Sequence, residues 1–122
     1  MRKHGLVAAE MLEGKLSESC LHAIKAHDYG SGIEPKSTID NALIATDCVW
    51  FLVVRATLAA PQKKTRELNL GTLKKAFESE SLPAYLRNGI LMCKDVGLTL
   101  DQFLRLALTA IPDDVVISSD DL

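Results

Sequence analysis

The chain has 122 residues, which is enough for one domain with a hydrophobic core that needs no disulfide to fold. Its composition, 48% hydrophobic and 25% charged, excludes a mainly disordered chain, and a formal net charge of -2 provides no field that would attract nucleic acid. The three cysteines include no CxxC pair, so we expect reduced thiols and a cytoplasmic location.

The first third of the chain predicts two short helices and a loop. Apolar residues at helical spacing predict a helix over residues 2–13 that ends at Gly14. Ser17 suits the N-cap of a second helix over 18–26. Residues 29–36 contain two glycines and a proline, which is typical of an irregular loop.

A long apolar helix follows, from Ser37 or Thr38 until Pro61. It approaches the length of a membrane span, but Asp47 and Arg55 interrupt it, so we expect a buried central helix and no membrane. A carboxylate in so apolar a helix must be desolvated, which is costly without compensating charges or donors. Asp47 therefore predicts either a structural salt bridge or a metal or active-site role.

The rest of the chain predicts three shorter helices after a basic connector at 61–68. We expect helices over 72–79, 81–97 and 100–111, the last with a capping box from Thr99 to Gln102. Residues 1–112 thus form a single all-α domain of about six helices. The acidic tail, 113–122, is either a flexible end or docks through its apolar residues 115–117.

Two histidines are candidate metal ligands together with Asp47. His27 alone would be a hydrogen-bonded core residue or a helix cap, but His27 and Asp47 together suit zinc, manganese or iron. His4 alone is typical of a surface histidine, and His22 is expected to be solvated on a polar helix face.

Other charged residues have weaker functional interpretations. Asp40 lies seven residues before Asp47 on the same helix face, near an N-terminus that favours a carboxylate. Lys63 and Lys64 either contact a substrate phosphate or belong to a solvated connector. The sequence has no GxSxG, no glycine-rich phosphate loop and no HExxH.

Three segments, taken in order, resemble a known family. They are HGLVAAEML from His4, AIKAHD ending at Asp28, and STIDNALIATD ending at Asp47. Together they resemble HD-domain metal-dependent phosphohydrolases, in particular the HDIG and HD-GYP-like branch, over residues 4–110. The resemblance implies a helical bundle that hydrolyses phosphate esters with one or two divalent metals.

By this resemblance His4, His27 and Asp47 are metal ligands. Asp28 and Asp40 would contact these ligands without binding the metal, or have a structural role. The metal would be zinc, manganese, iron or magnesium, or none. The family carries an upstream histidine and a His-Asp doublet on helices that precede the position of His4, and neither precedes His4 in this sequence. No catalytic residue beyond the metal ligands follows from the sequence.

Three interpretations therefore stand side by side. The chain is a truncated or diverged HD-domain protein with weak phosphohydrolase activity, a non-catalytic helical interaction module, or a fragment with a misassigned start. Because the long apolar helix lacks one of the family's covering layers, we expect the chain to form a homo-oligomer. No nucleic-acid or membrane partner is expected.

Overall fold

The computed structural model describes residues 3–112, 115–118 and 120, and over these residues it confirms an all-α fold of six helices. The only strand-like feature among them is an isolated bridge between Lys64 and Val116. In chain order the helical elements are α1 (His4–Leu12), α2 (Glu18–His27), η1 (Tyr29–Ser31), α3 (Thr38–Leu58), η2 (Thr65–Glu67), α4 (Leu70–Glu78), α5 (Ala84–Leu91), η3 (Met92–Val96) and α6 (Leu100–Ala110).

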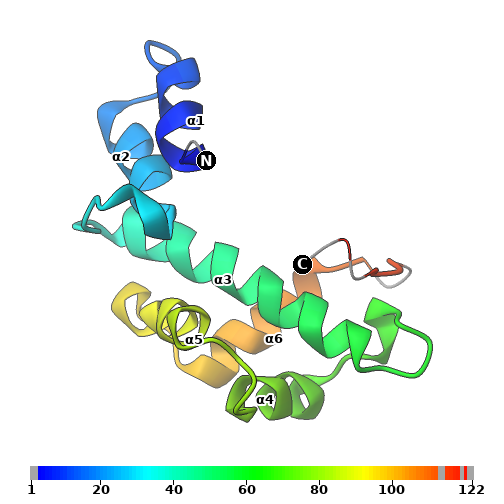
Figure 1. Ribbon diagram of the computed structural model, residues 1–122. Helices are drawn as coiled ribbons and strands as arrows, with labels where there is room; N and C mark the ends of the chain where they lie inside the picture. Colours follow the sequence, from blue (N-terminus) through cyan, green and yellow to red (C-terminus); the bar gives the residue numbers. More distant parts are fainter. Residues whose placement is uncertain (1–2, 113–114, 119, 121–122) are drawn as a thin grey trace.

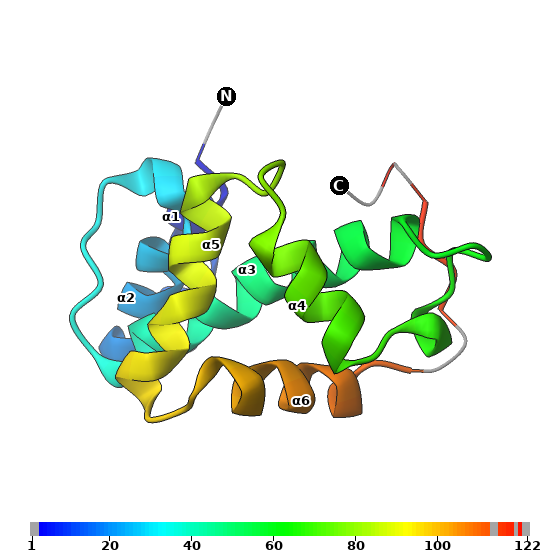
Figure 2. The ribbon, with the colours of Figure 1, turned by 90° about the horizontal axis from the view of Figure 1, so that it is seen from below.

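Helix α3 is the axis of the molecule. In Figure 1, α2 lies against its N-terminal part and α1 packs on α2, while α4 and α5 pack on its other side and α6 packs on α4 and η3. Figure 2 shows α5 and α4 crossing α3 from this second side. The largest fully buried side chains come from α3 and from the second side: Leu52 and Val53 on α3, Leu73 on α4, Ile90 on α5 and Leu104 on α6.

Local capping chemistry explains where most helices begin. The Ser17 hydroxyl accepts from the amide of Cys20, and reciprocal capping boxes join Ser37 with Asp40 and Thr99 with Gln102. Several predicted boundaries differ from the observed ones by two or three residues; the long helix, for example, ends at Leu58 and not near Pro61. Helix α4 begins two residues earlier than expected because Asn69 caps it, and the helix predicted over 81–97 divides into α5 and η3.

The apolar part of the C-terminal tail docks on the connector. Ile117 is buried, its amide donates to the carbonyl of Lys63 at 3.2 Å, and the amide of Thr65 donates to the carbonyl of Val115 at 3.0 Å. The sequence left two alternatives for the tail, a flexible end or docking through residues 115–117. These three residues are docked. Residues 113–114, 119 and 121–122 lie outside the described part of the chain.

Within the described part of the chain, one face of α3 is only partly covered. Ile39, Leu43, Thr46 and Trp50 follow one another at helical spacing, and Ile39 and Trp50 are 45% and 42% exposed. By length and composition alone α3 could also cross a membrane, with 44% of its apolar window buried inside the molecule. Core helices of globular proteins share this property.

Candidate functional site

The candidate site is a cavity of about 780 Å³ near the N-terminal half of α3. A volume of this size suits a small-molecule ligand. Residues of α1, the end of α2 and the segment after it, α3 and α5 all contribute to its wall. The polar and aromatic side chains of this wall are His4, His27, Asp28, Tyr29, Glu34, Asp47, Phe51, Tyr85 and Asn88.

Two of the predicted ligands meet in this cavity. The Nε2 atoms of His4 and His27 are 3.2 Å apart, and the two rings lie edge to face. His27 Nδ1 forms a short hydrogen bond with the carbonyl of Ile24. A carbonyl can only accept, so Nδ1 carries the proton and Nε2 of the neutral ring holds a lone pair directed at His4.

Asp28 orients His4 from the other side of its ring. Its Oδ2 lies 3.6 Å from His4 Nδ1 and accepts from the amide of Gly5 at 2.9 Å, while Oδ1 accepts from the amide of Gly30 at 3.1 Å. The Gly5 hydrogen bond is the main reason that the pKa of Asp28 is lowered, and it outweighs the opposing effect of burial. Positive charge on His4 and His27, whenever their rings are protonated, lowers this pKa further. Asp28 is therefore an anion that favours a proton on His4 Nδ1.

Gly5 makes this meeting of helices possible. A Cβ at this position would lie 2.6 Å from Cβ of Asp28 and 2.7 Å from the carbonyl oxygen of Ile24. Only glycine therefore lets α1 approach the end of α2 closely enough for His4 to reach His27.

Asp47 lines the same cavity, but its environment differs from the predicted one. The side chain is only half-buried, so the expectation of a desolvated carboxylate was wrong. No lysine or arginine among the described residues pairs with it. Nor do His4, His27 and Asp47, or any other three His, Cys, Asp or Glu residues in the described ranges, form a cluster able to hold a metal ion.

The fully buried carboxylate of α3 is Asp40, not Asp47. Its Oδ2 lies 2.7 Å from His22 Nδ1 and accepts from the amides of Lys36 and Ser37. Burial raises the pKa of Asp40, but these hydrogen bonds outweigh burial and lower it overall. The prediction of a solvated His22 was wrong, because its ring holds the start of α3 through Asp40.

Asp40 does not line the cavity, and its contacts are those of a helix cap. Lys63 and Lys64 do not line it either. Lys63 is exposed, with a positive φ of 54°; its carbonyl accepts from the amide of Ile117, and Lys64 pairs with Val116 in the isolated bridge. The structure therefore places the two lysines away from the histidine pair.

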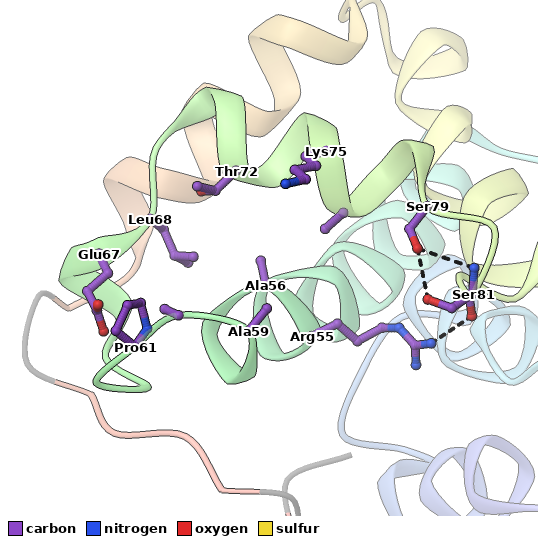
Figure 3. A pocket seen from close by; sticks show the side chains of 12 residues that line it. Arg55, Ala56, Ala59, Pro61, Glu67, Leu68, Thr72, Lys75, Ser79 and Ser81 are labelled. Atoms are coloured by element: carbon purple, nitrogen blue, oxygen red, sulfur yellow. Dashed lines mark hydrogen bonds between the residues drawn. The ribbon is translucent and has the colours of Figure 1, made fainter.

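A second groove of about 450 Å³ lies between α3 and α4. Figure 3 shows Thr72 and Lys75 of α4 on one side and Arg55 of α3 on the other, with Arg55 reaching Ser81. Arg55 Nη2 donates to the carbonyl of Ser81 at 2.7 Å. Four alanines line this groove and no histidine does, so the cavity with the histidine pair remains the candidate site.

Several residues of the site were missed by sequence reasoning. Gly5 follows His4 directly, but no sequence signal reveals what a Cβ there would touch. Tyr29, Tyr85 and Asn88 line the cavity although two of them come from α5, far along the chain. Tyr29 had a local signal, because it comes directly after the His27–Asp28 pair.

Comparison with protein-family models, with curated proteins and with solved structures found no match for this chain.

Proposed function

We propose that the chain is an HD-type domain that binds a divalent metal ion through His4 and His27 and hydrolyses phosphate esters at low rates. The observation that supports this proposal best is the 3.2 Å separation of the two Nε2 atoms. Two imidazoles that share one ion at metal–nitrogen distances of about 2.0–2.1 Å place their nitrogens roughly 2.9–3.4 Å apart. The order of His4, His27 and Asp47 in the resembling segments also supports it.

The donor chemistry fits such an ion at two positions. His27 Nε2 already has a lone pair, because its Nδ1 proton is held by Ile24. His4 needs only to place its proton on Nδ1, toward Asp28, and its Nε2 lone pair is then free as well. A third ligand is not in position. Asp47, on the wall of the same cavity, is the residue that we assign to this role after a change of side-chain rotamer.

A bound divalent ion would supply Lewis acidity toward the phosphate and a lower pKa for an attacking water. The side chains of the protein would hold the ion and orient its ligands. Asp28 favours the ligand tautomer of His4, and the carboxylate of Asp47 would complete the ligand set after its change of rotamer. In the overall reaction, water adds to phosphorus, the ester P–O bond breaks, and the alcohol leaves with a proton from that water.

Calorimetric titration with Zn²⁺ and Mn²⁺ tests the metal site. We expect one ion per chain, and at least ten-fold weaker binding in His4→Ala, His27→Ala and Asp47→Asn. Asp101→Asn, a half-exposed carboxylate of α6, is the matched control for Asp47 and should bind metal normally. Hydrolysis of p-nitrophenyl phosphate should require the metal and be lost in the same variants. No bound ion, or unchanged affinity in His27→Ala, would exclude the proposed site.

A second candidate function is a non-catalytic module that self-associates. The uncovered stripe of α3 favours it, because Ile39, Leu43 and Thr46 also line an apolar hollow of about 330 Å³ between α2 and α3. Light scattering tests this candidate. A dimer that dissociates in Ile39→Lys and Trp50→Lys, without metal binding in the parent protein, would favour the interaction module over the hydrolase.

A further inference from the structure

Two tyrosines meet at the wall of the histidine cavity. Tyr29 comes from η1 and Tyr85 from the first turn of α5, and their ring centroids are 5.3 Å apart at an interplanar angle of 37°. Both residues line the cavity that also contains His4 and His27. They are the only two tyrosines in the chain.

Both rings are largely open to solvent. Tyr29 is 83% exposed and Tyr85 is 48% exposed, so neither contributes much to the core. Neither hydroxyl has a hydrogen-bond partner among the described residues. Exposed aromatic rings that gather at a cavity offer a rigid apolar surface, which is the property that binding sites for planar groups use.

The rest of the cavity wall is compatible with a planar group. Phe51, Ile33 and Pro35 add apolar surface, and Asn88 adds one amide that can both donate and accept hydrogen bonds. The volume of about 780 Å³ is larger than the histidine pair and one phosphate need. The cavity therefore has room for a ring beside an anionic group.

We propose that Tyr29 and Tyr85 form a specificity-determining surface that binds the planar aromatic group of an aryl or heteroaryl phosphate ester. The ring packs against the tyrosine pair, and the phosphate is directed to His4 and His27. The phosphate half of this assignment rests on the proposed metal-dependent function. The aromatic half depends only on the tyrosine pair, so the two can fail separately.

Fluorine NMR on protein labelled with 3-fluorotyrosine tests the proposal, since the chain gives only two signals. Phenyl phosphate, ethyl phosphate and phenol are titrated in turn with Mg²⁺ present. We expect phenyl phosphate to shift both signals and to bind at least five-fold more tightly than ethyl phosphate. Calorimetry measures the same preference for phenyl over ethyl phosphate in Tyr29→Leu and Tyr85→Leu. It should fall about three- to ten-fold in these variants, because leucine keeps apolar bulk without a ring face.

The controls separate the possible outcomes. Tyr29→Phe and Tyr85→Phe keep the ring and should keep the preference, as should Trp50→Leu, which removes an exposed aromatic residue that does not line the cavity. A different outcome is that phenol and phenyl phosphate bind with equal affinity and that His27→Ala changes neither affinity. That result would support the aromatic surface and exclude the phosphate site. Equal binding of phenyl and ethyl phosphate, or fluorine signals that do not move, would overturn the tyrosine proposal.

Discussion

The imidazole of His22 and the carboxylate of Asp40 form a 2.7 Å contact that joins α2 to the first turn of α3. The Asp40 side chain is fully buried and its second oxygen, Oδ1, has no hydrogen-bond partner among the described groups. Asp40 therefore depends on the donors around Oδ2, namely His22 and the amides of Lys36 and Ser37. This contact therefore links α2 to α3, and both helices also contribute residues to the histidine cavity.

The Asp40 carboxylate should make stability depend on pH. Its pKa is lowered in the folded protein, so its contribution is present above the unfolded value of about 3.9 and is lost as pH falls through the folded value. We expect Asp40→Asn to reduce the free energy of unfolding by about 2–3 kcal/mol at pH 7 and by less at pH 3. Urea unfolding of both proteins across this range measures the difference. A constant difference would contradict the assigned role.

Asp28 should affect metal binding without being a ligand. In Asp28→Asn the anion beside His4 Nδ1 is lost, although the amide oxygen can still accept from Gly5. We expect metal affinity to fall about 10- to 100-fold while the stoichiometry stays the same. Calorimetric titration with Zn²⁺ measures both quantities. Complete loss of binding with a folded protein would instead make Asp28 a direct ligand.

Gly89 should be required for the contact between α5 and α3. A Cβ there would lie 2.3 Å from Sγ of Cys48. Alanine favours a helix by about 1 kcal/mol over glycine, but the clash should outweigh this gain and leave Gly89→Ala about 2 kcal/mol less stable. In a Cys48→Ala background the penalty should shrink by at least about 1 kcal/mol. Thermal and urea unfolding of the four proteins in this cycle test the coupling.

The three cysteines should differ in reactivity. Burial raises the pKa of Cys48 to about 11, with a smaller contribution from the nearby Asp47 charge, and burial also raises the pKa of Cys93. At pH 8 only about one in a thousand Cys48 thiols is then ionised. Cys20 is only partly buried, so iodoacetamide should label it first in the native protein. Peptide mass spectrometry reads out the order, and early labelling of Cys48 would contradict its buried position.

Ile117 should anchor the C-terminal segment. Its side chain is 3% exposed and its amide bonds to Lys63, so Ile117→Ala removes buried methyl groups as well as packing. We expect a loss of about 2 kcal/mol in the free energy of unfolding. Val116→Ala is the matched control, because Val116 is 64% exposed and should change stability by less than about 0.5 kcal/mol. Equal effects of the two substitutions would argue against docking.

The sequence by itself determined the all-α class and most helix ends. These features depend on local physics: apolar residues at helical spacing, and short polar side chains such as Ser17 and Thr99 that satisfy the free amides of a first turn. The sequence also singled out His4 and His27, which the tertiary structure brings to 3.2 Å from each other. Local patterns suffice where the interacting groups are neighbours along the chain.

Only the tertiary structure decided which carboxylate is buried and what surrounds the histidines. Asp40 and Asp47 share one helix and nearly one face, yet His22 and the loop cover Asp40 while Asp47 faces a cavity. The close approach at Gly5 and the meeting of Tyr29 with Tyr85 likewise join residues far apart in sequence. The desolvation of a side chain depends on the elements packed over it, and a single sequence does not record that packing.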